Sequence, residues 1–272
     1  MIHNQSLTIP DSLKLNFDSK GYVIVPVSDS RALSELRQVV YHSAVEVLPD
    51  IEPSSAKSDI TEFFDQFHLR GLTGASLNDY RLELISRISS KVDVGEAVFK
   101  SLESSIEPLL GPDIVVQRWT NLVIQQPGDI NVPPVHRDAP MNSHFEIVCW
   151  IPFNHCFETK GMIVLDKEQS EYVLELLADP YQGFDAFADF AMTQGSTLDV
   201  PYGHALIFWT GLVHAVPINQ ETSTRWSMNI RYKNFFSPFG SKGLPDFFKI
   251  LKLSPLTRLA LNAERASLLS KS

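Results

Sequence analysis

The N-terminal third of the chain contains one short apolar run and two stretches in which apolar residues recur at helical spacing. Residues 21–26 are rich in β-branched and aromatic side chains, which predicts a strand. The spacing predicts a helix over residues 30–48, capped by Asp29, and a second helix that ends at Gly111. The apolar faces are Leu33, Leu36, Val40 and Val47 in the first, and Val98, Leu102, Ile106 and Leu109 in the second. The polar residues 49–60 predict a loop.

From residue 114 the pattern changes to many short β-prone runs, separated by Gly, Pro and Asn. These runs lie at 115–116, 122–124, 145–153, 162–165, 205–209, 213–218 and 226–232. Many short strands with turn residues between them are typical of a sandwich or a barrel. We therefore predict a mainly β fold with flanking helices, arranged as a double-stranded β-helix (an antiparallel, cupin-like jelly roll).

Two segments depart from this rhythm. Residues 169–195 begin with a helical pattern and continue after Pro180 into an aromatic-rich stretch, which we interpret as an inserted helix and loop between strands. After Pro238, the apolar residues predict one or two terminal helices that pack on the barrel. The expected organisation is one jelly-roll domain over residues 1–236, with its N-terminal helices, and a C-terminal helical extension over 237–272.

Composition and charge narrow the class of protein. The chain has 272 residues and a formal net charge of −9, which does not favour nucleic acid or an anionic membrane as a partner. From Lys233 onward the net charge is +5, so this segment is a solvated basic tail or a docking face for an anionic partner. Two cysteines make no disulfide framework, and no run approaches the ~18 apolar residues of a membrane span. With no signal-peptide run at the start, we expect a cytoplasmic protein.

Three residues form a candidate metal site. His136 and Asp138 are two positions apart in an extended segment, so both point to the same side, and His214 lies in a later β-rich run. A jelly roll can bring the two segments together. Two imidazoles and one carboxylate on one face of a metal are the ligand set of non-haem Fe(II) oxygenases. Such a set also occurs at hydrolytic zinc sites, although the chain lacks the helical His-Glu-x-x-His motif. The alternative is a surface turn and an ordinary core histidine.

A second pattern supports the functional interpretation. In the run 224–232 the alternation places Arg225, Ser227, Asn229 and Arg231 on one side of a strand. Arginine binds carboxylates in bidentate fashion, and a nearby serine hydroxyl can add a hydrogen bond. Arg225 is therefore a candidate for holding a carboxylate, with a surface ion pair as the alternative. Arg231 could hold substrate, bind a cosubstrate or close a salt bridge.

These residues resemble a known family. His136-x-Asp138, His214 and Arg225-x-Ser227 are similar to the motifs of Fe(II)- and 2-oxoglutarate-dependent dioxygenases, nearest the phytanoyl-CoA dioxygenase-like branch. Residues 17–26 look like the opening strand of that branch, and the likeness covers most of residues 15–236. The resemblance implies that the first three residues bind Fe(II). It also implies that Arg225, with Ser227, holds the distal carboxylate of 2-oxoglutarate, with O2 as the oxidant.

The resemblance is incomplete at one point. The branch often has a Pro-Gly-Ser-His turn after Gly-x-Leu, whereas here residues 161–166 run into Lys-Glu-Gln-Ser. The pocket rim is therefore remodelled, and acyl-CoA is not implied as substrate. The acidic chain with extra C-terminal helices resembles oxygenases of surface-carbohydrate gene clusters.

The expected function is oxidation, for example hydroxylation, of a small polar metabolite such as a sugar or a nucleotide-sugar. Arg70, Arg137, His144, Asn229 and Arg231 are candidates for facing the substrate. Two other classes stay open: a metal-dependent cupin sugar isomerase or epimerase, and a non-catalytic sugar-binding jelly roll. Arg225-x-Ser227 argues against the isomerase, because that reaction needs no 2-oxoglutarate.

Overall fold

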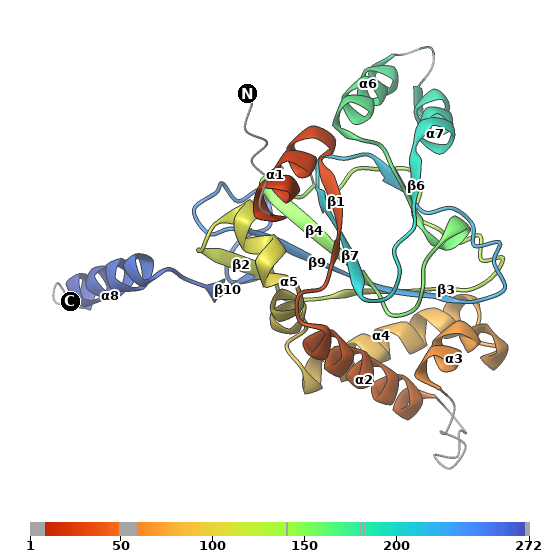
Figure 1. Ribbon diagram of the computed structural model, residues 1–272, viewed down its shortest axis with the longest axis horizontal. Helices are drawn as coiled ribbons and strands as arrows, with labels where there is room; N and C mark the ends of the chain where they lie inside the picture. Colours follow the sequence, from red (N-terminus) through yellow and green to blue (C-terminus); the bar gives the residue numbers. More distant parts are fainter. Residues whose placement is uncertain (1–8, 49–58, 140, 180, 182, 270–272) are drawn as a thin grey trace, which may run out of the picture.

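A computed structural model describes residues 9–48, 59–139, 141–179, 181 and 183–269 (Figure 1). The predicted loop at 49–60 falls almost entirely outside these residues. Within them, the helices are α1 (Ile9–Lys20), α2 (Ser30–Val47), α3 (Ile60–Asp65), α4 (Gly74–Lys91), α5 (Val94–Leu110), α6 (Lys167–Ala178), α7 (Gly183–Gln194) and α8 (Pro255–Leu269). None of the described helices is long and apolar enough to span a membrane.

The described strands form two antiparallel sheets. The larger has the order β1-β7-β4-β9-β2-β10, and β3 pairs with the first half of β9. The smaller has the order β6-β5-β8. The strands are β1 (Tyr22–Pro26), β2 (Ile114–Gln117), β3 (Asn121–Gln125), β4 (Glu146–Pro152), β5 (Met162–Val164), β6 (Ser196–Leu198), β7 (His204–Trp209), β8 (His214–Ala215), β9 (Arg225–Asn234) and β10 (Phe248–Lys252). The predicted fold class, a jelly roll with flanking helices, is confirmed.

The two faces of the large sheet have different partners. One face packs against helices α2 to α5, which lie together on one side of the molecule (Figure 1). It contributes alternate apolar side chains of β4 and β9, including Cys149, Ile151, Trp226 and Met228. The other face looks into the barrel, where Trp150 and Phe208 pack against Met162 and Val164 of the small sheet. Because side chains alternate along a strand, the remaining positions of β9 also face the barrel interior.

Local sequence explains the predicted helices. The Asp29 carboxylate accepts hydrogen bonds from the backbone N–H groups of Arg31 and Ala32, both at 3.0 Å, which satisfies free donors at the start of α2. The predicted apolar residues Leu33, Leu36 and Val40 are buried against the sheet. Helix α5 ends at Gly111, whose φ of 82° is a conformation that glycine adopts without steric cost.

The insertion between β5 and β6 differs from the prediction. Its first part is helix α6, as expected, but the stretch interpreted as an aromatic-rich loop contains a second helix, α7. The reason lies in the spacing of its apolar residues, because Phe187 and Ala191 are four positions apart and are both buried under α6 and the small sheet. The aromatic residues of this stretch are therefore a helical face and not a loop.

The C-terminal segment also differs. Residues 248–252, predicted as helix, form strand β10, which pairs with β2. Pairing with β2 fixes this strand: Phe248 to Ile250 lie in regular register opposite Gln117 to Val115, and a β-bulge follows between Ile250 and Lys252. The sheet therefore includes residues on both sides of the boundary expected after residue 236. Beyond it, α8 extends away from the body (Figure 1), and Leu256 and Leu259 on it are largely exposed.

Candidate functional site

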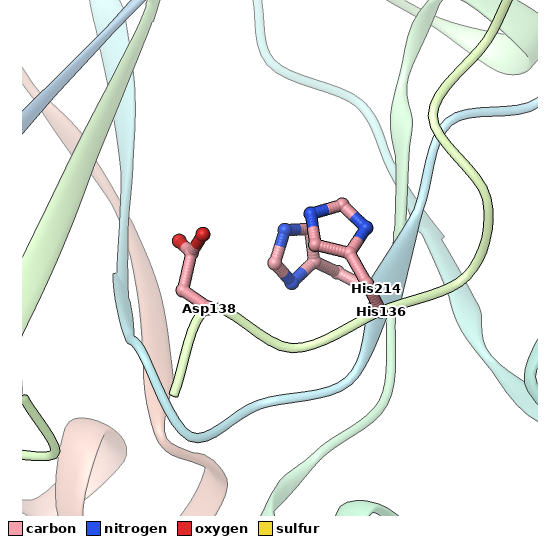
Figure 2. A group of neighbouring side chains, drawn as sticks. All are labelled: His136, Asp138 and His214. Atoms are coloured by element: carbon pink, nitrogen blue, oxygen red, sulfur yellow. The ribbon is translucent and has the colours of Figure 1, made fainter. Parts of the chain in front are cut away.

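The two predicted histidine ligands lie side by side on paired backbone segments. His136 precedes β4 in an extended segment, and His214 begins β8. Their backbones form an isolated antiparallel bridge: His136 N–H donates to the His214 carbonyl at 3.1 Å, and His214 N–H donates to the His136 carbonyl at 2.8 Å. The ring centroids are 4.4 Å apart, and both rings project to the same side (Figure 2).

Each imidazole is held in the form that a metal requires. Nδ1 of His136 lies 2.7 Å from the Pro134 carbonyl, and Nδ1 of His214 lies 3.0 Å from the Leu212 carbonyl. A carbonyl only accepts, so each Nδ1 carries the proton, and in the neutral ring Nε2 is left with a free lone pair. Burial, together with the neighbouring His136, lowers the pKa of His214 to about 4. His214 is therefore neutral at physiological pH.

Asp138 completes the group. Its carboxylate lies beside the two rings (Figure 2), and the potential ligand atoms of the three residues all lie within 4.8 Å of one another. The turn after Asp138 is closed by Asn142, whose backbone N–H and side-chain amide both donate to the Asp138 carbonyl, at 3.0 and 3.1 Å. Two imidazoles and one carboxylate suit a divalent transition ion such as Fe(II). The structure thus brings the three predicted residues together, and their role as ligands stays a prediction.

Arg231 fixes the carboxylate in place. Its Nη2 donates to Oδ1 of Asp138 at 2.7 Å, and both side chains are mostly buried. Of the three roles considered for Arg231, the salt bridge is therefore present. Groups that orient a metal ligand in this way tune its basicity and geometry. The sequence did not identify Asp138 as its partner, because 93 positions separate the two residues.

Arg225 occupies the barrel interior as an unpaired cation. Its side chain is 1% exposed, and no carboxylate among the described residues pairs with it. Its Nη1 makes only two long hydrogen bonds, to the carbonyls of Lys160 at 3.5 Å and Gly161 at 3.3 Å, and Nε has no partner. The guanidinium lies 5.6 Å from the centre of the Trp150 ring. Burial lowers the pKa of Arg225, because the guanidinium is removed from water.

Unsatisfied polar atoms continue along the same face. Besides Arg225 Nε, the buried atoms without a hydrogen-bond partner include Ser227 Oγ, Asn229 Oδ1 and Arg231 Nε on β9, and Gln125 Oε1 on β3. Gln125 is the cross-strand neighbour of Arg225. Most buried polar groups in proteins are hydrogen-bonded, and each one left unpaired costs about 1–3 kcal/mol. A row of such atoms on the strand that carries Arg231 indicates an interior built for a polar ligand, in which the arginine Nε atoms offer donors and the amide oxygens offer acceptors.

The other candidates occupy less informative positions. Trp150 and Phe208 are buried in the barrel core. His144 stays at the surface, where its carbonyl accepts from Trp209 Nε1 at 2.7 Å. A further cation, Lys242, donates to Asn142 Oδ1 at 2.7 Å, although no sequence pattern marked it. It follows the predicted domain boundary in a loop, where periodicity gives no signal.

Comparisons with known proteins bear on the fold. No family model and no curated protein sequence matches the chain. Among solved structures, the chain is similar to a non-haem monooxygenase, ThoJ, in a nickel complex. The TM-score is 0.51 at 16% identity, over 89% of this chain and 84% of that one. It is also similar to SnoN, a non-haem α-ketoglutarate-dependent epimerase from nogalamycin biosynthesis, with TM-score 0.50, 14% identity and 87% of each chain.

A third structure is HygX from Streptomyces hygroscopicus, with nickel and 2-oxoglutarate bound. It has a TM-score of 0.50 and 10% identity over 85% of this chain and 88% of that one. At these identities the likeness concerns the fold. The chain has the jelly-roll fold of non-haem oxygenases, which is the fold that the sequence resemblance implied.

Proposed function

We propose that this protein is a non-haem Fe(II)- and 2-oxoglutarate-dependent dioxygenase. One observation carries the proposal: three potential ligand atoms lie within 4.8 Å of one another, and β9, whose Arg231 contacts one of them, also carries the buried guanidinium of Arg225, which has no carboxylate partner among the described residues. The first feature fits a divalent ion, and the second fits a dicarboxylic acid.

Each residue has a defined task. His136 and His214 offer neutral Nε2 atoms, oriented by their hydrogen bonds to backbone carbonyls, and Asp138 offers an oxygen held by Arg231. Arg225 and Ser227 hold the distal carboxylate of 2-oxoglutarate, and the apolar ring of Trp150 excludes water from that contact. When bound, Fe(II) and the oxo acid supply the coupled reduction of O2 and decarboxylation that oxidise a substrate C–H bond.

The alternatives explain less of the site. A sugar isomerase or epimerase that needs no oxo acid leaves the Arg225 charge without a function, and burying an unpaired charge costs several kcal/mol, of order 5 or less after relaxation. A sugar-binding jelly roll does not require two imidazoles with matching Nδ1 hydrogen bonds. Two similar structures support the metal and the oxo acid, since ThoJ is found in a nickel complex and HygX with nickel and 2-oxoglutarate bound.

The substrate we propose is a small polar metabolite, either a sugar or a nucleotide-sugar. A cavity of about 310 Å³ lies between α4 and β3, near the segment that leads to His136. Its polar lining consists of Asn78, Arg81, Asn121, Asp129 and Asn131. Asn121 is the cross-strand neighbour of Asn229, so this lining continues toward the barrel interior. Amides and an arginine are suitable partners for hydroxyl groups. The oxidation is a hydroxylation or a related C–H oxidation.

The proposal is tested by metal-dependent turnover of 2-oxoglutarate. With Fe(II) and O2, the purified protein should form succinate slowly without substrate. His136→Ala and His214→Ala should abolish this, because each removes one ligand. Arg225→Ala should mainly raise the 2-oxoglutarate requirement. His144→Ala is the matched control, since this histidine lies at the surface near the same strand. Undiminished turnover in either ligand variant would contradict the assignment.

A further inference from the structure

Three cations gather on the Asp138 side of the candidate metal site. Arg231 and Lys233 occupy alternate positions of β9 and face the barrel interior, and Lys242 comes from the loop that follows this strand. We refer to Arg231, Lys233 and Lys242 as the cation cluster. The described carboxylates that act on it are Asp138 and Glu146, so three positive charges face two negative ones.

Neither Arg231 nor Lys242 is fully partnered. Arg231 uses Nη2 for Asp138, while its buried Nε has no hydrogen-bond partner. Lys242 has a neutral acceptor, Asn142 Oδ1, and its ammonium lies 4.7 Å from the centre of the Phe247 ring. Burial lowers the pKa of Lys242, and the nearby charge of Arg231 lowers it as well. Both cations thus lie close together with spare donor capacity.

Lys233 and Glu146 form the enclosed end of the cluster. Lys233 is fully buried and donates to the Pro238 carbonyl at 2.5 Å, with the Phe239 ring 4.1 Å away. Glu146 is its cross-strand neighbour, and Oε1 of Glu146 accepts from Ser143 N–H at 2.8 Å. Burial raises the pKa of Glu146, which lies opposite Lys233. With Glu146 beside Lys233, Asp138 is the described carboxylate left to balance both Arg231 and Lys242.

Ligand binding increases this imbalance, a step that rests on the proposed function. The charges of a divalent ion and a dianionic oxo acid cancel each other. Asp138, however, would then share its negative charge with the ion and would pair less strongly with Arg231. We propose that Arg231 and Lys242 bind an anionic group of the substrate, a carboxylate or a phosphate, next to the metal. Arginine and lysine donors to such a group form charge-assisted hydrogen bonds. The substrate is then an acidic or phosphorylated compound, and a nucleotide-sugar or an acidic sugar fits better than a neutral one.

The site can be tested without metal. Asp138→Asn keeps the shape of the side chain but removes the charge that competes for Arg231. Metal-free full-length protein carrying this change should bind inorganic phosphate about tenfold more tightly than the wild type in a calorimetric titration, the scale of one charge-assisted hydrogen bond. Adding Arg231→Gln should remove the gain, and adding Lys242→Gln should reduce it several-fold. Adding Arg87→Gln is the matched control, because Arg87 is also ion-paired but lies on the exposed face of α4.

The outcomes separate this inference from the proposed function. If Arg231→Gln lowers the free energy of unfolding but leaves phosphate affinity unchanged, Arg231 only positions Asp138 and the inference is wrong. Equal phosphate affinity in wild type and Asp138→Asn would also overturn it. A parallel titration with acetate distinguishes the anion, since tighter acetate than phosphate binding indicates a carboxylic acid substrate. Co(II) binding by the wild type is measured separately, and its absence would overturn the metal site without affecting the phosphate result.

Discussion

Replacement of Arg225 by methionine should separate stability from function in this protein. The guanidinium is buried and lacks a carboxylate partner among the described residues, and burial lowers the pKa of Arg225. Methionine has a similar length and fills irregular core space without a charge. In the absence of ligands, the substitution removes a desolvated cation and keeps most of the packing against Trp150.

The expected magnitude follows from the contacts. Two long hydrogen bonds to carbonyls and one contact with an aromatic ring together contribute about 1–2 kcal/mol. Replacing a buried charged group with a well-packed apolar one stabilises by about 1–4 kcal/mol in known cases. We therefore expect the free energy of unfolding of the ligand-free protein to stay the same or to rise by about 1–2 kcal/mol. The loss of two charged hydrogen bonds to 2-oxoglutarate should weaken its binding by about 100-fold or more.

The assay is urea unfolding of wild type and Arg225→Met, each with and without 2-oxoglutarate and Zn(II) as an inert metal. In the wild type the ligand should raise the unfolding midpoint, because it binds only the folded state. In the variant this shift should disappear. Arg37→Met is the matched control, since Arg37 is partly buried and makes short hydrogen bonds, to Phe153 O at 2.7 Å and Thr61 Oγ1 at 2.9 Å. It should lose about 1–3 kcal/mol of stability and keep the ligand-induced shift.

If Arg225→Met is destabilised as strongly as Arg37→Met while the 2-oxoglutarate shift is retained, Arg225 is an ordinary structural arginine, held by its carbonyl contacts. A stable variant with an unchanged shift would likewise exclude Arg225 as the anchor of the oxo acid.

Three further predictions concern the same interior. The pKa of His214 is about 4 in the folded protein against an ordinary value of 6.5, so the unfolded chain binds the proton at a higher pH than the folded one. The free energy of unfolding of the metal-free protein should therefore fall by up to about 3 kcal/mol as the pH drops from 6.5 to 4. Urea unfolding across this range should show a flatter profile for His214→Asn, and an equally steep profile would contradict the burial argument. Burial raises the pKa of the Cys149 and Cys156 thiols, that of Cys156 to about 12. Neither cysteine should therefore react with a thiol reagent before global unfolding, and prompt labelling at pH 8 would be inconsistent with the fold. Ser227→Ala should raise the 2-oxoglutarate requirement several-fold without loss of stability, because Ser227 Oγ has no partner in the ligand-free protein; a large drop in unfolding free energy would show that the hydroxyl is structural.

Much of the fold could be predicted from the spacing of apolar residues and from the capping and turn residues between the elements. Helices α2 and α5 and most of the strands follow from spacing, capping and turn residues. Helix α4 had the same signal, because Leu77, Tyr80, Leu84 and Ile88 are buried at helical spacing, yet it was not predicted. Strand β10 could not be recognised by pattern alone, because its short apolar run is compatible with either helix or strand and pairing with β2 decides between them.

The candidate site divides in a similar way. The two-residue spacing of His136 and Asp138 in an extended segment was enough to place both on one side, and the jelly roll brings His214 to them. The electrostatic state of the site depends on distant partners. Only the folded structure shows that Arg225 has no carboxylate partner among the described residues and that Arg231 pairs with Asp138. Lys242 lies in a loop, where the sequence has no periodicity that could mark it.

The most direct test of the central claim is an anaerobic titration of the metal-free protein with Fe(II) and then with 2-oxoglutarate, followed by visible absorption. We expect one Fe(II) bound per chain and a charge-transfer band that saturates at one equivalent of 2-oxoglutarate. The band should be absent in His136→Ala and should require much more 2-oxoglutarate in Arg225→Met. A wild-type protein that binds Fe(II) no better than His136→Ala, or that shows no band at saturating 2-oxoglutarate, would contradict it.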